Sequence, residues 1–328
     1  MIREKESVCA VVVTYNRKEL LIECLEALRM QVRPIQGIYL IDNASTDGTP
    51  NLLLEKGYIG KLPPENLTEP WEREFEIKNL TDGKSIKLHY VRMHENTGGA
   101  GGFHEGVKRA YEKGYDWLWL MDDDAEPKND TLRNLLLAKV DNSVAALCPL
   151  ILHKSGDYQL YHHKFINKWN MEDIPVVDSV EKLEPITEIE ANAFVGPLIN
   201  RNFIKMVGFP RKELFIWGDD TEYMYRLSRL GKVLLCKNAV ILHKDTRKKL
   251  DSKSAKKYYF YFRNRIFIIR HYSKLKFFAY LYFIYKAVRT TISFRMKYKL
   301  PLSVSTAPVK GIWDGVKIYL VTEIFRRL

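Results

Sequence analysis

Three consecutive carboxylates at the end of an apolar segment are the clearest candidates for chemistry in this chain. Residues 117–121 read Trp-Leu-Trp-Leu-Met, and Asp122, Asp123 and Asp124 follow directly. In an extended backbone, side chains two positions apart share a face, so Asp122 and Asp124 are predicted to converge on one ion while Asp123 points away. Their oxygens favour Mg²⁺ or Mn²⁺, which commonly also bind phosphate. A solvated acidic turn is the alternative for these residues taken alone.

The elements that must position these carboxylates alternate between strand and helix. Short β-branched apolar runs predict buried strands, and a 3.6-residue apolar period predicts helices between them. The expected strands are residues 8–13, 37–41, 88–93, 117–122 and 144–152, and the expected helices include residues 20–28, 104–113 and 128–140. Such alternation predicts an α/β fold with a Rossmann-like, mostly parallel sheet. Residues 60–87, with three prolines and mixed charges, are expected to be an insertion outside that sheet.

Polar and glycine-rich loops follow the first three predicted strands. Because open α/β sheets bind ligands at the carboxyl ends of their strands, these loops are expected to meet in one cleft. They carry Thr14, Tyr15, Asn16 and Arg17, then Asp42 and Asn43, and then glycines at 98, 99, 101 and 102. The glycine cluster is expected to let the backbone approach a diphosphate and present N–H groups to it. An ordinary turn is the alternative.

The second half of the chain adds another pair of carboxylates. Gly218, Asp219 and Asp220 begin a predicted helix that runs to about residue 230. Asp219 is expected near the N-cap of this helix, and a carboxylate in its first turn, such as Asp220, stays ionised and can act as a base. Trp217 is expected either to offer a flat apolar surface to a ligand or to be a core tryptophan.

Taken in order, these segments resemble glycosyltransferase family 2. The segments that carry the resemblance, over roughly residues 7–245, are Thr-Tyr-Asn-Arg at 14–17, Asp-Asn-Ala-Ser-Thr-Asp at 42–47, Asn-Thr-Gly-Gly at 96–99, Asp-Asp-Asp at 122–124 and Gly-Asp-Asp-Thr-Glu-Tyr at 218–223. The resemblance implies the GT-A fold and inverting sugar transfer. Residues 96–103 together with 121–125 are most similar to bacterial galactofuranosyltransferases, and rhamnosyltransferases of the same family come next.

The resemblance also implies a role for each candidate residue. Asp42 would read the uracil of a UDP-sugar. The remaining nucleotide-sugar contacts would come from Thr14, Tyr15, Asn16, Arg17, Asn96, Gly98, Gly99 and Asp122. A Mn²⁺ or Mg²⁺ ion that bridges the two phosphates would be held by Asp122, Asp124 and His243, although a lone histidine after a strand is usually structural.

On the acceptor side, the resemblance assigns the catalytic base to Asp220. Asp219 and Asp123 would support catalysis, and Trp217 would form the sugar platform. Residues 151–190 fit the family poorly and are expected to be a variable loop region that recognises the acceptor.

The charge of the chain is concentrated in its last quarter. The whole sequence has a net charge of +12, but residues 247–328 contain 20 Lys and Arg against 3 Asp and Glu, which leaves a net charge of −5 for residues 1–246. We therefore expect a catalytic domain at 1–246, with a nucleotide-sugar half (1–125) and an acceptor half (126–246), followed by a basic helical tail at 247–328. The longest uncharged apolar run in the tail, residues 277–285, is far shorter than the roughly 20 residues of a membrane span.

The composition of the tail predicts its partners. Lys and Arg interleaved with Tyr and Phe suit an anionic membrane surface, and the tail is also a candidate surface for self-association or for covering the catalytic domain. Nucleic acid is not an expected partner, because a nucleic-acid binder does not need ordered carboxylates at strand ends. Four isolated cysteines and the absence of a signal-like N-terminus predict a cytoplasmic protein, peripheral on the inner face of a bacterial membrane.

The sequence thus predicts a metal-dependent enzyme of bacterial surface polysaccharide synthesis. It is expected to transfer galactofuranose from UDP-galactofuranose to a lipid-linked glycan. The alternative donors are dTDP-rhamnose and a UDP-hexopyranose. Outside the enzymes, the alternative is a non-catalytic protein that binds nucleotide-sugars or nucleic acid.

Overall fold

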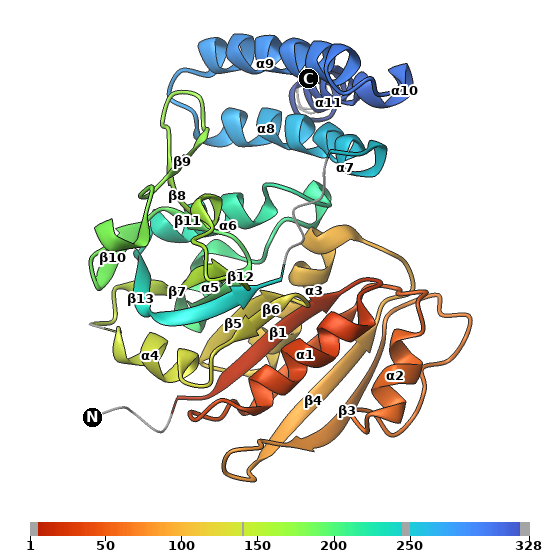
Figure 1. Cartoon of the computed structure of the whole chain (residues 1–328), viewed down its shortest axis with the longest axis vertical. Helices are drawn as coiled ribbons and strands as arrows, with labels where there is room; N and C mark the ends of the chain where they lie inside the picture. The colour runs from red at the N-terminus through yellow and green to blue at the C-terminus, as the bar shows by residue number, and fades with distance from the viewer. Residues whose placement is uncertain (1–5, 140, 245–249, 322–328) are drawn as a thin grey trace.

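A mixed sheet of ten strands forms the centre of the computed structural model, which describes residues 6–139, 141–244 and 250–321 (Figure 1). In spatial order the strands are β10 (Ile186–Ile189), β13 (Lys232–His243), β7 (Val144–His153), β12 (Val195–Asn200), β5 (Trp117–Asp122), β1 (Val8–Thr14), β2 (Gly37–Asp42), β4 (Ser85–Arg92) and β3 (Trp71–Lys78), with β6 (Ala125–Pro127) paired to β13. Strands β5, β1, β2 and β4 are mutually parallel, as predicted for the first half of the chain. Strand β1 is buried along its whole length, which explains its continuous apolar sequence.

Helices cover both faces of the sheet. One face packs against α1 (Lys18–Arg29), α2 (Thr49–Glu55) and α4 (Thr131–Leu137). The helix predicted at 128–140 corresponds to α4 and is shorter than expected. The other face packs against α3 (Gly98–Lys113), α5 (Arg201–Val207) and α6 (Asp219–Ser228). Side chains of alternate residues in β1 enter the two cores: Val11 joins α3, and Val12 joins α1.

Two sequence-based expectations about the first half are wrong. Residues 71–78, expected in an insertion, form β3, an edge strand antiparallel to β4. Their sequence hides the strand because charged residues outnumber apolar ones, which is a common protection for a sheet edge. The glycine cluster at 98–102 is not a loop but the first turns of α3, which begins six residues before the predicted start at 104.

Glycines in α3 allow the helix to lie close to the sheet. A Cβ atom at Gly102 would lie 2.6 Å from Val13 Cγ1, and one at Gly106 would collide with Val11. A Cβ atom at Gly99, in contrast, would meet nothing within 4 Å. Most of this glycine pattern therefore serves helix packing, whereas contacts of Gly98 and Gly99 with a nucleotide-sugar stay a prediction.

Residues 151–190, expected to be a variable loop region, contain regular structure. A small sheet pairs β11 (Ala191–Asn192) with β8 (His163–Ile166) and β8 with β9 (Asp173–Pro175), and β10 joins the main sheet. These short strands alternate poorly in sequence, so their pairing is decided by tertiary contacts.

The tail is helical and shares a core with the rest of the protein. It consists of α7 (Ser252–Lys256), α8 (Tyr258–Tyr272), α9 (Lys276–Met296), α10 (Leu302–Ser305) and α11 (Ala307–Val316), ending in a π-helical turn at 317–321. Phe262, Ile266 and Ile269 of α8 belong to the same apolar cluster as Tyr223 of α6 and Phe103 of α3. Figure 1 shows these helices stacked on the side of the molecule that carries α6. Within residues 6–139, 141–244 and 250–321, no helix is long and apolar enough to cross a membrane.

We predict that Gly106→Ala destabilises the protein by about 1–3 kcal/mol, the usual cost of overpacking, because the new methyl group would collide with Val11. Gly99→Ala, in the same helix but with open space around it, should be neutral or stabilising by up to about 1 kcal/mol. Urea unfolding of both variants measures the difference. Equal stabilities would contradict the packing role of these glycines.

Candidate active site

The candidate residues of the first half lie at one edge of the sheet. The parallel register pairs Val13 with Asp122 and Thr14 with Asp42, so three strands end at the same level. The loops after β1, β2 and β5 therefore meet at the carboxyl ends of the strands, where open α/β sheets bind ligands. This arrangement agrees with the prediction that these loops meet, and the cleft itself stays a prediction.

The three carboxylates do not follow the alternation expected of an extended strand. Strand β5 ends at Asp122, and Asp123 and Asp124 form a turn before β6, so the same-face argument for Asp122 and Asp124 was wrong. The Asp123 carboxylate accepts a hydrogen bond of 2.7 Å from Thr14 Oγ1 and lies 3.4 Å from Arg17 Nη1. Arg17 also pairs with Asp124. The loop after β1 is thus tied to the acidic turn by charge.

Three carboxylates are crowded in this region: Asp123 and Asp124 are buried, and Asp122 is partly buried. Burial, followed by repulsion from Asp124 and Asp123, raises the pKa of Asp122 well above its usual range. Burial also raises the pKa of Asp123 to about 6, against the opposing effect of Arg17. For Asp124, burial is outweighed by His243 and Arg17, which lower its pKa. A bound cation would stabilise the ionised form of all three groups.

Asp124 and His243 face each other beside the acidic turn. His243 Nδ1 lies 2.8 Å from Gln159 Oε1, a contact that suits a proton on Nδ1 and leaves Nε2 to bind a second proton or a metal ion. Nε2 lies 3.3 Å from Asp124 Oδ1, and no other described residue donates a hydrogen bond to that buried oxygen. These two atoms can share a proton, as an ion pair of Asp124 with protonated His243, or bind one metal ion. Asp124 and His243 therefore fit two ligands of one divalent cation.

The third predicted ligand, Asp122, does not complete a metal site by itself. Among the residues that the structure describes, no group of three His, Cys, Asp or Glu side chains is arranged to hold a metal ion. Since Mg²⁺ and Mn²⁺ commonly take phosphate and water oxygens as further ligands, an incomplete protein shell suits a cation that binds together with a diphosphate. The role of Asp122 as a ligand stays a prediction.

Asp42 is buried and its carboxylate is already engaged. It accepts hydrogen bonds from Tyr90 Oη (2.8 Å), Arg92 Nη1 (2.6 Å) and the Ser45 amide (2.9 Å). This network fixes the loop after β2. Direct recognition of a uracil by Asp42 stays a prediction, and it would require the base to compete with these partners.

Asn43, which the sequence placed only in a loop, connects two of the site loops. Its Nδ2 donates to Asn96 Oδ1 (3.1 Å) and to the Gly98 carbonyl (2.9 Å), and its Oδ1 accepts from the Thr97 amide (3.0 Å). The Asn96 side chain, predicted to contact the nucleotide-sugar, also accepts from the Gly98 amide. Asn43 therefore locks the start of α3 against the end of β2.

The loop after β1 leaves side chains available to a ligand. Tyr15 is exposed, and Asn16 has a positive φ of 55° and accepts from the Thr46 amide at 2.6 Å. This contact joins the loops after β1 and β2. An exposed aromatic ring beside two ordered loops could stack on a nucleoside base.

Asp219 and Asp220 lie in the first turn of α6 but face different surroundings. Asp219 is buried, and burial together with repulsion from Asp220 raises its pKa to about 8. Its charge also contributes to the raised pKa of Asp122, which places Asp219 on the side of the acidic turn. Asp220 is partly exposed and accepts from the Thr221 amide. The structure therefore separates a buried carboxylate from an accessible one. Gly218, rather than Asp219, occupies the N-cap position.

Trp217 is exposed, so its interpretation as a core tryptophan is wrong. Its ring meets Tyr258 of the tail edge-on, with ring centroids 5.3 Å apart. Trp217 lies two residues before the carboxylate pair, where a sugar acceptor could pack against its ring.

Two residues near the site were missed by sequence reasoning. Lys164 of β8 is buried, donates to Thr221 Oγ1 (2.8 Å) and pairs with Asp173 (3.2 Å). Although burial opposes its charge, Asp173 and Asp220 raise the pKa of Lys164. The His162 ring lies perpendicular to His243, with ring centroids 4.9 Å apart. Neither position has a sequence motif, because the contacts arise from the fold of the 151–190 region.

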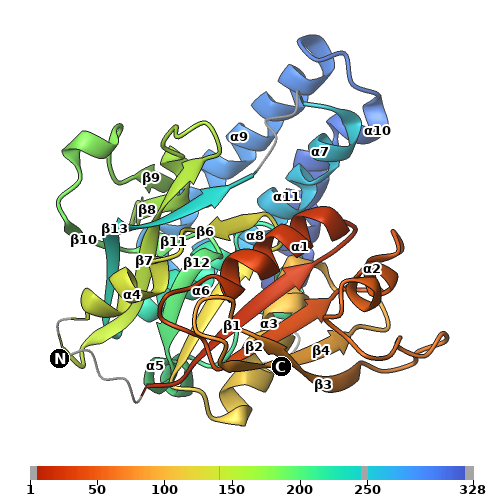
Figure 2. The same cartoon turned by 60° about the horizontal axis from the view of Figure 1, so that its bottom comes forward.

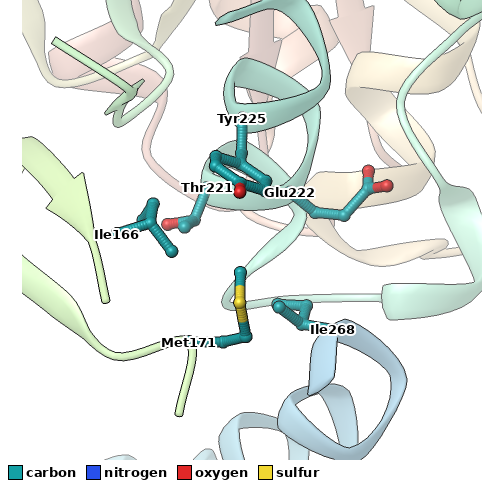
Figure 3. Close-up of a pocket in the computed structure, with 6 residues that line it drawn as sticks. All are labelled: Ile166, Met171, Thr221, Glu222, Tyr225 and Ile268. Carbon is teal, nitrogen blue, oxygen red and sulfur yellow. The ribbon is translucent and has the colours of Figure 1, made fainter. Parts of the chain in front are cut away.

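A small apolar pocket lies where three segments pack together, and it is not a ligand site. Figure 3 shows Ile166 and Met171 of the β8–β9 region, Tyr225 of α6 and Ile268 of α8 around it. The pocket has no room for a water molecule. It marks the contact of α8 in the tail with α6 and the β8–β9 region.

Comparison with known proteins identifies the family. The profile of the family described as Glycosyl transferase family 2 matches residues 9–59 and 74–195. Galactofuranosyltransferase GlfT1 of Mycolicibacterium smegmatis is 29% identical over 243 residues, which cover 73% of this chain and 71% of that protein. Galactofuranosyltransferase GlfT1 of Mycobacterium tuberculosis is 28% identical over the same length, covering 73% of this chain and 70% of that protein.

Solved structures with low sequence identity share the fold. GalNAc-T7, crystallised with UDP, GalNAc and Mn²⁺, superposes with a TM-score of 0.60 at 15% identity, covering 97% of this chain and 57% of that chain. The mannosyltransferase PcManGT from Pyrobaculum calidifontis, in complex with GDP-Man and Mn²⁺, gives a TM-score of 0.55 at 13% identity, covering 95% and 88%. These likenesses confirm the GT-A fold. With its family profile matched over more than half of its residues, the chain belongs to glycosyl transferase family 2 and is a glycosyltransferase similar to the galactofuranosyltransferases.

Proposed function

We propose that the enzyme transfers galactofuranose from UDP-galactofuranose to a lipid-linked glycan with inversion, in bacterial surface polysaccharide synthesis. The observation that carries this proposal is the facing pair of Asp124 Oδ1 and His243 Nε2, 3.3 Å apart beside the acidic turn. A diphosphate leaving group needs positive charge, and a divalent cation held by these two residues would supply it. The similarity to GlfT1 proteins supports the choice of sugar.

The residues around this pair are proposed to divide the work. Thr14, Tyr15, Asn16, Arg17, Asn96, Gly98, Gly99 and Asp122 would line the nucleotide-sugar side, with Asp42 at the base. Asp220 would take the proton of the acceptor hydroxyl as its oxygen attacks the anomeric carbon opposite the diphosphate. Partial exposure of Asp220 and the neighbouring Lys164 charge support this assignment.

The donor is tested by a screen of nucleotide-sugars with Mn²⁺ present. UDP release from UDP-galactofuranose, but not from UDP-hexopyranoses, would support the proposal. dTDP release from dTDP-rhamnose would instead assign the rhamnosyltransferase alternative. A protein that binds a donor without turnover on any acceptor would favour the non-catalytic alternative.

We predict that turnover requires Mn²⁺ or Mg²⁺ and is lost in excess chelator. Asp124→Asn should weaken metal-dependent UDP binding, measured by calorimetry with and without Mn²⁺, because it removes the charge facing His243. Asp116→Asn, a carboxylate at the opposite end of β5, is the matched control and should bind UDP normally. Full activity in chelator would exclude the metal assignment.

A second prediction concerns the carboxylate pair of α6. Asp220→Asn should lower kcat by about 10²-fold or more with little change in donor affinity, because general base catalysis contributes on that scale. Asp219→Asn should have the smaller effect on kcat, since Asp219 is buried. The reverse order of the two effects, with both variants folded, would transfer the base role to Asp219.

We further propose that the tail attaches the enzyme peripherally to the cytoplasmic face of the membrane. An apolar face of α9, which we call the outer face, carries eight side chains that are 44–74% exposed: Phe277, Phe278, Leu281, Ile284, Tyr285, Val288, Ile292 and Met296. Their spacing follows the helical period, so they form one stripe.

Exposed Lys274, Lys276, Arg289 and Arg295 lie on or beside the same helix. Figures 1 and 2 show α9 at the outside of the molecule, away from β3 and β4. Self-association through this face is the alternative.

The attachment is tested on the whole chain, because α8 belongs to the main core and a truncated protein would lose part of it. Phe277→Ser combined with Leu281→Ser and Ile284→Ser should abolish sedimentation with phosphatidylglycerol vesicles. A matched triple variant at exposed apolar residues elsewhere, Leu137→Ser with Met206→Ser and Leu230→Ser, should still bind. Wild-type binding should weaken in high salt, because screening acts over about 8 Å at physiological ionic strength. Equal binding of the two variants would refute the role of the outer face. If the wild-type protein instead increased in mass with concentration and only the first variant lost this increase, the face would be assigned to self-association.

A further inference from the structure

The loop before the α6 carboxylates has an unusual backbone. Within residues 214–218, Phe215 has φ 63°, Trp217 has φ 64° and Gly218 has φ 97°. Left-handed conformations are rare for residues with a side chain, and large aromatic residues adopt them only where surrounding contacts enforce them. Something outside the loop must therefore hold it in this shape.

Asn264 of α8 supplies those contacts. Its Nδ2 donates to the carbonyls of Leu214 (2.9 Å), Ile216 (3.0 Å) and Trp217 (2.7 Å), and the residue is almost completely buried. Three carbonyl acceptors require a donor, which fixes the orientation of the amide, and its two hydrogens are shared among them. One side chain thus contacts three carbonyls within a loop of five residues.

Arg263 reinforces this arrangement. Its Nη2 donates to the carbonyls of Glu213 (2.9 Å) and Leu214 (2.8 Å), and its Nε donates to Asn264 Oδ1 (3.0 Å). The amide of Asn264 is therefore held at its acceptor end while its donor end holds the loop. Ile268, one turn further along α8, lies next to Gly218.

The opposite side of the loop rests on the donor half. The Phe215 carbonyl accepts a hydrogen bond from the Ala100 amide (3.1 Å) in the first turn of α3. A Cβ atom at Gly98 would collide with the same carbonyl. The loop is thus held between α3, which carries Gly98 and Gly99, and α8 of the tail, and its far end leads directly into Asp219 and Asp220.

We infer that Asn264 is a positioning residue for catalysis: it holds the 214–218 loop so that the α6 carboxylates and Trp217 face the donor. Asn264 acts through the loop and is not assigned a contact with substrate. The expected loss of kcat rests on the proposed function, whereas the contact between Asn264 and the loop does not. The basic tail therefore completes the catalytic site in addition to any attachment role.

The test uses the full-length enzyme with Asn264→Asp, which keeps the size of the side chain but turns a carboxylate oxygen toward the three carbonyls. We expect kcat to fall at least tenfold, since displacements of about 1 Å can cost about 10²-fold, while UDP affinity stays within about twofold. Hydrogen exchange of the amides at 214–218 should become faster. Arg263→Gln, which removes the bonds to the Glu213 and Leu214 carbonyls from a partly exposed position, should change both quantities in the same direction and serves if Asn264→Asp does not fold.

Ile269→Val, a buried change in the same helix, is the matched control and should leave kcat and loop exchange unchanged. Unaltered exchange at 214–218 in folded Asn264→Asp would overturn the contact. Faster exchange with unaltered kcat in Asn264→Asp would overturn the positioning role. A loss of kcat in Ile269→Val as large as that in Asn264→Asp would overturn it as well. If the wild-type enzyme released no nucleotide from any donor, the proposed function would fail, whereas the exchange measurement would still decide whether Asn264 holds the loop.

Discussion

Buried carboxylates crowded at the carboxyl ends of β1 and β5 are the constraint on which this structure depends. Asp122 interacts with Asp123, Asp124 and Asp219, and burial is the main cause that raises the pKa of Asp122, Asp123 and Asp219. At Asp124 the effect of burial is outweighed by His243 and Arg17. Such an arrangement is costly unless positive charge is supplied. Arg17 supplies part of it from the loop after β1, and Nε2 of His243 faces an Asp124 oxygen to which no other described residue donates. The remaining deficit is what makes the site suited to a cation that arrives with a diphosphate.

The same constraint explains why the surrounding loops are so firmly cross-linked. A charged site that must keep its geometry without a complete metal shell needs support from further hydrogen bonds. Asn43 joins the loop after β2 to the start of α3, and Asp42 is held by Tyr90 and Arg92. Asn264 plays the corresponding part on the acceptor side, from a helix that lies far away in sequence.

The tail has two distinct sides, one packed against the rest of the enzyme and one exposed. Its inner side, through α8, enters the apolar core and contacts the loop that leads to Asp220. Its outer side, through α9, exposes an apolar stripe flanked by cations. An acceptor carried by a lipid would have to reach the site close to a membrane, and a single helical layer that touches both would suit this need.

The sequence by itself determined the buried strands, the order of the loops and the family, because continuous apolar runs and carboxylates at strand ends are local signals. It identified Asp124 and His243 as partners only through a resemblance, since they are far apart in the chain. The roles of the glycines in α3, the edge strand β3, the exposure of Trp217, and the contacts of Asn43, Lys164 and Asn264 were decided by the tertiary structure alone. Each of these depends on which distant segment lies opposite, and a side chain that satisfies carbonyls 50 residues away leaves no periodic pattern in the sequence.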